Sequence, residues 1–270
     1  MRQTVLFAWL LALFVSGACS IHSETVVVGA LTRVHAAGVG EEYGGSISLR
    51  NVGGVSEEVK VYVNDYLFYA DGRNIYGEPG TNPRSNTAWL NYGPKQLTVA
   101  ARASATISYS IRIPEDVSLR GTYWCILMVE VVPPASPEAS GERGDKVAVG
   151  VTQVFRYGIQ IVTHLRETGT RALSFAGTRL LKTDGGLELA IDAENTGERW
   201  LIAECWLELY AENGEHVGRY GGTALRIYPG TSVRFLVDVG DLGSGTYRAL
   251  VVLDCGGDDV FGATYDLAIE

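Results

Sequence analysis

Four histidines are the residues best suited to acid–base or metal chemistry in this chain of 270 residues: His22, His35, His164 and His216. None stands in a His-x-x-His or Glu-x-x-His spacing, the patterns that bring two zinc ligands together on one element. The chain also has no Gly-x-Ser-x-Gly turn and no cysteine and histidine in a recognisable catalytic context. We therefore expect no enzyme activity, no bound metal and no cofactor.

Three carboxylates, Asp254, Asp258 and Asp259, cluster around a pair of glycines. Carboxylate oxygens at a loop are the ligands that calcium takes, but no further ligand spacing supports such a site here. We interpret this cluster as a solvated turn. The glycine-rich residues 37–45 do not stand between a strand and a helix, so they do not predict a phosphate site.

The four cysteines indicate how export would affect the chain. Cys205 and Cys255 fall on segments that we expect to be neighbouring strands, which makes them the candidate pair for a disulfide in an oxidising compartment. Cys125 alternates with large apolar residues, so we expect a buried, unreactive thiol. Cys19 belongs to the N-terminal leader.

Residues 1–23 have the form of a secretory signal peptide, with Arg2 at the start, an apolar core at residues 5–15 and small residues at 16–20. Simple cleavage would release a periplasmic or secreted protein. Cleavage before Cys19 would instead make this cysteine an acylated N-terminus, although Ser16 stands where a lipobox has an aliphatic residue. Both alternatives stay open, and a lipid on Cys19 would be the sole contact with a membrane.

Two similar segments organise the rest of the chain: LRGTYWCILMVE at residues 119–130 and GSGTYRALVVLD at residues 243–254. Each has Gly-Thr-Tyr, then an apolar run that ends at an acid, as in the central strand of a β-sandwich. Upstream of each segment, a stretch of alternating apolar and polar residues ends at an asparagine, Asn51 in the first half and Asn195 in the second. A glycine follows two residues after each asparagine. Tyr123 and Tyr247 stand where a tyrosine corner would place a ring inward and bond its hydroxyl to nearby backbone.

The repeat predicts an all-β protein of two tandem immunoglobulin-like β-sandwich domains. The first would span residues 24–166, with a long insertion at residues 69–94 that is rich in Gly, Asn and Pro. The second would span residues 167–270 and contain seven short strands. A net charge of −9, from 31 acidic and 22 basic residues with no basic stripe, makes nucleic acid an unfavourable partner.

Several passages carry a resemblance to known families: SISLRNVGG, SNTAWLNYGP, IRIPEDVSLRGTYWCILMVEV and QVFRYGIQIVTH in the first half, and ENTGERWLIAECWLELYAENG and YPGTSVRFLVDVGDLGSGTYRALVVLDCGGD in the second. The chain resembles exported bacterial proteins with tandem Ig-like domains, including the surface proteins that accompany WxL cell-wall proteins. It is similar, more distantly, to periplasmic pilus-assembly chaperones. The chaperone resemblance implies that Arg33 and Arg156 hold a client's terminal carboxylate in a cleft between the domains. It also implies that residues 147–163 form a strand with an edge open to β-strand addition.

Three functions are consistent with these patterns. The first is a non-enzymatic exported binding or scaffold protein of the cell envelope, which acts through contacts with another envelope or surface protein. The first alternative is a periplasmic chaperone for pilus or surface subunits. The second alternative is a carbohydrate-binding module that recognises a surface polysaccharide with Trp89, Tyr92 or Trp200.

Overall fold

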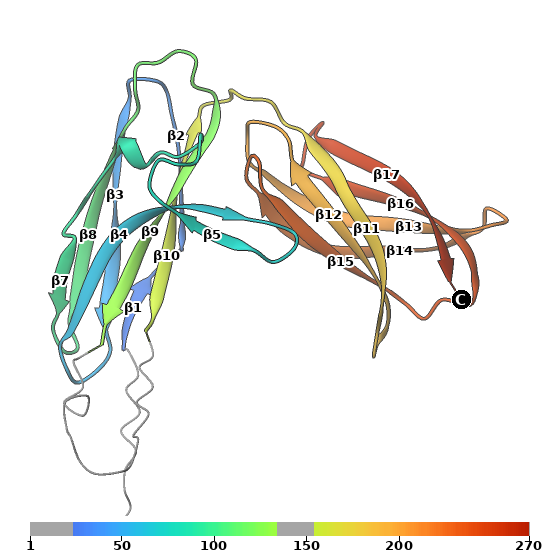
Figure 1. The fold of residues 1–270 in the computed structure, drawn as a ribbon, viewed down its shortest axis with the longest axis horizontal. Helices are drawn as coiled ribbons and strands as arrows, with labels where there is room; N and C mark the ends of the chain where they lie inside the picture. Colours follow the sequence, from blue (N-terminus) through green and yellow to red (C-terminus); the bar gives the residue numbers. More distant parts are fainter. Residues whose placement is uncertain (1–23, 134–153, 270) are drawn as a thin grey trace, which may run out of the picture.

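The structure, a computed structural model, describes residues 24–133 and 154–269 (Figure 1). Residues 1–23, which carry the expected signal peptide and Cys19, lie outside the described residues. The first part of the expected strand at residues 147–163 lies outside them too. In the described part of the chain, no helix is long and apolar enough to cross a membrane.

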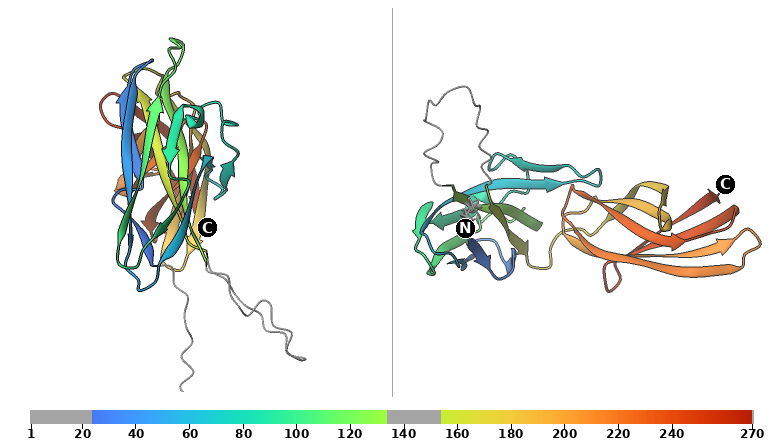
Figure 2. Two further views of the ribbon diagram at one scale, coloured as in Figure 1. Left: turned by 90° about the vertical axis from the view of Figure 1, so that its left-hand side faces the viewer. Right: turned by 90° about the horizontal axis from the view of Figure 1, so that it is seen from below.

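The described chain forms two β-sandwiches joined end to end, as Figure 2 shows. One sheet of the first sandwich has the strand order β1 (Thr25–Val28), β3 (Glu42–Asn51), β8 (Ser104–Arg112) and β6 (Leu90–Gly93). Its second sheet has the order β2 (Thr32–Ala37), β10 (Arg156–Leu165), β9 (Gly121–Val132), β4 (Glu57–Phe68) and β5 (Asn74–Gly77), and β7 (Gln96–Val99) also pairs with β4. A short 3-10 helix, η1 (Thr87–Trp89), precedes β6.

The second sandwich has seven strands. One sheet has the order β11 (Leu173–Thr183), β12 (Gly186–Asn195) and β15 (Ser232–Gly240). The other sheet has the order β14 (His216–Ile227), β13 (Leu201–Ala211), β16 (Gly245–Asp254) and β17 (Val260–Ile269). Both sandwiches consist of antiparallel pairs except for β2, which runs parallel to β10. The prediction of an all-β protein built from two Ig-like sandwiches is confirmed.

Strand β9 is apolar on both of its faces, which explains its central position. Cys125, Leu127 and Val129 point into the first core and are fully buried. Trp124 and Ile126 point to the opposite face of the same sheet and are also buried. Because a half-exposed strand would alternate with polar residues, this continuous run requires cover on both sides.

Two buried asparagines, Asn51 and Asn195, occupy equivalent positions in the two sandwiches. The Asn51 amide donates to the carbonyl oxygens of Val55 and Val99, at 2.7 and 3.1 Å, and its oxygen accepts from Gly53 N at 2.8 Å. Asn195 makes the same three hydrogen bonds, to the residue four positions on, to a distant strand and from the glycine two positions on. The repeated Asn-x-Gly pattern therefore marks the same asparagine-centred set of three hydrogen bonds in both domains.

The insertion at residues 69–94 is tied to the first sandwich by strand pairing and by side-chain contacts. The Trp89 ring packs against Tyr123, with ring centroids 4.7 Å apart. The buried carboxylate of Asp65, on β4, accepts hydrogen bonds from Asn82 N at 2.7 Å and from the Ser85 hydroxyl. The guanidinium of Arg84 also lies over the Tyr123 ring, 5.5 Å from its centroid. Tyr247 does form the expected corner, donating to Gly243 O at 3.0 Å.

Candidate functional site

A small apolar cluster joins the two sandwiches. Trp124 from β9 and Val162 from β10 lie on the outer face of the first domain's larger sheet, and Tyr228 reaches them from the loop after β14. All three are fully buried, and the Trp124 and Tyr228 rings are stacked with centroids 4.7 Å apart. The Tyr228 hydroxyl also donates to Gln160 Oε1 at 2.5 Å. This cluster covers the outer face of β9 at Trp124.

Polar contacts around Thr122 fix the same joint. Its hydroxyl oxygen accepts from Trp200 N at 2.9 Å, and its own N–H donates to Glu198 O at 2.9 Å. The hydroxyl lies 2.9 Å from Nδ1 of His164, and the His164 ring meets Trp200 edge-on at 4.8 Å. Next to Thr122, Gly121 has a φ of +76°, and a Cβ there would lie 2.0 Å from Glu198 O. The start of β9 therefore docks directly against the loop before β13.

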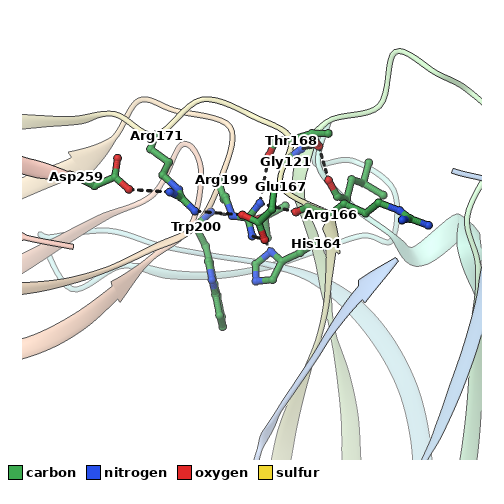
Figure 3. A network of polar contacts seen from close by, with 11 residues as sticks. Gly121, His164, Arg166, Glu167, Thr168, Arg171, Arg199, Trp200 and Asp259 are labelled. Carbon is green, nitrogen blue, oxygen red and sulfur yellow. Dashed lines mark hydrogen bonds and ion pairs between the residues drawn. The ribbon is translucent and has the colours of Figure 1, made fainter. Parts of the chain in front are cut away.

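Charged residues of the linker surround this joint (Figure 3). Arg199 pairs with Glu167 at 3.2 Å, and Arg171 pairs with Asp259 at 2.9 Å. Burial, and to a smaller extent the positive charge of Arg199, lowers the pKa of His164 to about 4. His164 is consequently neutral at neutral pH.

The angle between the sandwiches contains an open pocket of about 390 Å³, rich in aromatic residues. Its lining comes from both domains: Tyr66, Phe68, Tyr69, Asn74 and Gln160 from the first, and Leu225, Arg226, Tyr228, Ser232, Val233 and Arg234 from the second. Such a concave surface, with a few polar groups among aromatic rings, is typical of a binding site.

Arg226 is the unpaired cation of this pocket. Its guanidinium lies over the Trp200 ring at 4.3 Å and donates to Thr32 Oγ1 at 3.2 Å, while its Nε is buried without a partner. Within the described chain Arg226 forms no salt bridge, whereas Arg234 is held by Asp192 at 2.6 and 2.8 Å. Arg226 therefore keeps the capacity to bind a carboxylate.

Strand β10 has an open edge for part of its length. β9 pairs with it from Arg156 to Leu165, but β2 covers its other side only from Gln160 onward. Gln160 N donates to Leu31 O on that side, and strand alternation then directs the N–H and C=O groups of Gly158 and Arg156 the same way. The expected free edge is thus absent from Gln160 to Thr163, while residues 156–159 have no strand neighbour on the side opposite β9 among the described residues.

A second pocket, of about 340 Å³, lies on the outer face of the sheet beside this edge. Its lining residues are Tyr62, Asn64, Tyr76, Met128, Arg156 and Gly158. The absence of a side chain at Gly158 lets Ile126 pack against the backbone of β10, because a Cβ at Gly158 would lie 2.5 Å from Ile126 Cδ1. The open edge and this hollow together form a surface that an extended segment could follow.

The two arginines predicted to act together are not brought together. Arg33 is in register with Ile161 and shares its inward face, whereas Arg156 lies on the outward face of the same sheet. Five residues along β10 separate their positions, or roughly 16 Å. Arg156 is paired with Glu130 at 2.6 Å, and the Nε of Arg33 is buried without a partner. Sequence reasoning missed Arg226, because it reaches this site from the second domain and no local motif marks it.

The candidate disulfide is not formed. Cys205 and Cys255 are free thiols, as is the buried Cys125. Cys205 is opposite Leu253, so Cys255 is its diagonal neighbour across the strand pair, and such neighbours are typically about 7–8 Å apart at Cα. A disulfide needs Cβ atoms closer than that geometry usually places them. Burial raises the pKa of Cys205 to about 12 and that of Cys255 to about 11, which leaves both protonated.

The acidic turn is occupied by protein contacts. Asp259 binds Arg171, and Asp254 accepts from Gly256 N at 2.8 Å. Across residues 24–133 and 154–269, no group of three His, Cys, Asp or Glu side chains is placed to hold a metal ion.

Comparison with known proteins finds similarity in solved structures alone. No family model and no curated protein matches the chain. A chain of the chaperone–tip adhesin complex of CFA/I fimbriae is 11% identical, with 89% of this chain and 97% of that chain covered and a TM-score of 0.47. The chaperone CupB2 of Pseudomonas aeruginosa is 13% identical over 91% of this chain and 100% of its own, with a TM-score of 0.42.

A third structure, from the chaperone–tip subunit complex CsuC–CsuE of Acinetobacter baumannii, is 12% identical over 90% of this chain and 97% of its own, with a TM-score of 0.43. These similar structures are all of pilus-assembly chaperones or their complexes. The resemblance to WxL-associated surface proteins finds no support from a family model or a curated protein.

Proposed function

We propose that this protein is a non-enzymatic, exported chaperone-like protein that binds an extended segment of another envelope protein by β-strand addition. The observation that carries the proposal is the open edge of β10 at residues 156–159, which ends beside the unpaired guanidinium of Arg226. Several of the similar structures are of chaperones in complex with adhesin or pilin subunits. This class of partner matches the alternative in which the chain assists pilus or surface subunits.

The open edge of β10 ends close to Arg226, at Thr32. β2 begins at Thr32, which is in register with Gln160, so the open edge of β10 ends where β2 starts. Arg226 donates to that same Thr32. A client strand lying in line with β2, and parallel to β10 as β2 is, would direct its C-terminal end at the guanidinium. An antiparallel client would bring its N-terminal ammonium there instead, and the two positive charges would repel.

A parallel client strand therefore fits this geometry, with its terminal carboxylate on Arg226 and its outward side chains toward the pocket beside Met128. Arg226, rather than Arg33, would be the anchor, since Arg33 faces the interior of the sandwich. Arg156 would act through its backbone N–H and C=O groups at the open edge. Export through residues 1–23 and acylation of Cys19 stay predictions.

A photocrosslinking amino acid at Arg156 tests the proposal in cells that export the protein, with the same group at the exposed Leu181 of the second domain as the control. We expect adducts with secreted subunits from position 156 and none from position 181. Arg226→Glu should abolish those adducts, because it replaces the cation with a carboxylate.

Two matched substitutions separate backbone pairing from side-chain contact. Arg156→Pro and Arg156→Ala both remove the pair with Glu130, but only proline also removes the N–H at the open edge. We expect Arg156→Pro to lose client capture while Arg156→Ala keeps most of it. Equal capture by both variants would refute strand addition. Capture of wall polymer in place of protein would instead support the polysaccharide alternative. In that alternative the Trp89 and Trp200 rings are each already in contact with a protein group, Tyr123 and Arg226 respectively.

A further inference from the structure

The pocket of about 340 Å³ beside the open edge of β10 has walls that protein contacts already hold in place. Its lining comes from β10, β9, β4 and β5. The Tyr62 hydroxyl donates to Glu130 Oε2 at 2.9 Å, and Arg156 Nε donates to the same oxygen at 2.6 Å. Asn64 Nδ2 donates to Gly77 O at 3.0 Å, which fixes the end of β5. A side chain that enters this pocket therefore meets preorganised walls.

The chemistry of these walls favours an aromatic ring. The Tyr62 and Tyr76 rings and the Met128 thioether line the pocket. Aromatic rings attract one another in offset and edge-to-face arrangements, and a thioether sulfur makes favourable contacts with ring edges. Tyr76 is 53% exposed, so much of its surface is left for a ligand to cover.

Glycine at position 158 gives a neighbouring strand access to these walls. A Cβ at Gly158 would lie 2.5 Å from Ile126 Cδ1 and 3.5 Å from Met128 Sδ. Because β10 contributes no side chain at this position, Ile126 and Met128 extend across it toward the open edge. Neighbouring strands lie about 4.8 Å apart, so a long side chain on a client residue opposite Gly158 would reach these two groups.

The crossing of the chain at Leu31 determines which client residue lies there. Gln160 N donates to Leu31 O at 2.8 Å, so Leu31 takes the place before Thr32 along β10. The place opposite Gly158 is then the last one open to a client strand in line with β2. A parallel client puts its final residue there, with its carboxylate toward Arg226 and its side chain on the same outer face as Gly158.

We propose that this pocket selects clients whose C-terminal residue is aromatic, with the ring packed over Gly158 against Met128 and the two tyrosines. The inference rests on the proposed strand addition and adds the chemistry of the last client residue, which backbone pairing alone does not distinguish. The class of partner is thus an envelope protein whose chain ends in phenylalanine, tyrosine or tryptophan.

Fluorescence anisotropy on the purified exported protein tests this selection with short labelled peptides. Each peptide is N-acetylated, alternates threonine and valine, and ends in a free phenylalanine, tyrosine, leucine or alanine. We expect the two aromatic peptides to bind with dissociation constants at least about tenfold below that of the alanine peptide, because the ring is buried in the pocket. The leucine peptide should lie between them.

Two neighbouring substitutions on β5 test the location of the ring. Tyr76→Ala removes a wall of the pocket, whereas Ile75→Ala alters an exposed residue of the same strand that does not line it. Tyr76→Ala should reduce the preference for phenylalanine over alanine by about two- to tenfold and leave the affinity for the alanine peptide unchanged. Ile75→Ala should keep the preference. Unchanged thermal melting shows that both variants are folded.

The outcomes separate this inference from the proposed function. If Arg156→Pro abolishes binding of every peptide but the last residue makes no difference, strand addition stands and the aromatic selection is refuted. If no peptide binds, or if Arg156→Pro binds them all as well as the wild type does, strand addition fails and the selection fails with it. A preference that Tyr76→Ala and Ile75→Ala change equally refutes the assignment of the pocket.

Discussion

Asn195 allows a quantitative test of the buried asparagine hydrogen bonds that the two sandwiches share. Its side chain is fully buried and makes three hydrogen bonds, to Arg199 O at 2.8 Å, to Ile227 O at 2.9 Å and from Gly197 N at 2.9 Å. Asn195→Ala removes all three. At about 1 kcal/mol net for each bond, the free energy of unfolding of the second domain should fall by about 3 kcal/mol.

The loss should be visible as a lower melting temperature of that domain, by about 12 °C or more for a domain of this size. Differential scanning calorimetry measures it. Asn213→Ala is the control, because Asn213 is an exposed turn residue whose side chain accepts one hydrogen bond, from Glu215 N at 3.0 Å. Its effect should stay within about 0.5 kcal/mol.

The chemistry of the amide makes a second substitution informative. Asn195→Asp keeps the acceptor for Gly197 N but places a carboxylate oxygen against two carbonyl oxygens that need a donor. At neutral pH we expect it to destabilise at least as much as Asn195→Ala. The reasoning is refuted if Asn195→Ala costs less than about 1 kcal/mol, or if Asn195→Asp is tolerated as well as the control.

Three further predictions concern the joint and the insertion. Gly121→Ala should lower the free energy of unfolding, measured by thermal unfolding, by about 2 kcal/mol or more, because its Cβ would lie 2.0 Å from Glu198 O. The control Gly54→Ala, whose Cβ would have nothing within 4 Å, should be nearly neutral. Equal effects of the two substitutions would contradict the docking of β9 against Glu198. Burial lowers the pKa of His164 in the folded protein to about 4, so neutral His164 should contribute to the free energy of unfolding above about pH 6.5, and this contribution should be lost as the pH falls toward 4. Urea unfolding at a series of pH values measures this change. A His164→Gln variant whose free energy of unfolding depends on pH in the same way would contradict the prediction. Asp65→Ala should increase hydrogen exchange at residues 81–86, and unchanged protection there would show that the carboxylate does not hold the insertion.

Local patterning predicted the architecture well, and the reason is physical. An apolar run such as that of residues 121–132 must be buried on both faces, so it can only be a central strand. The buried asparagines recur because an amide satisfies the backbone of a tight turn in the same way in both domains. The expected fold class, the seven strands of the second sandwich and the burial of Cys125 all follow from alternation and turn chemistry.

The candidate site was harder to predict, because residues from two domains form it. Arg33 and Arg156 each lie on a strand of the expected kind, but the direction of a side chain depends on register, which sequence alone did not provide. Arg226 is distant from both in sequence, and it became a candidate because the domain joint places it over Trp200 and beside Thr32. The same holds for Cys205 and Cys255, where an offset of two positions across a strand pair separates the thiols.

The sequence by itself thus determined which segments are strands and which strands are central, since these depend on the polarity of neighbouring residues along the chain. Tertiary structure alone decided which edges stay open, which cation remains unpaired and which residues of the two domains meet. Those properties depend on register, on the crossing of the chain from β1 to β2 at residues 29–31, and on the docking of Tyr228 against Trp124. They result from contacts between residues that are far apart in the chain.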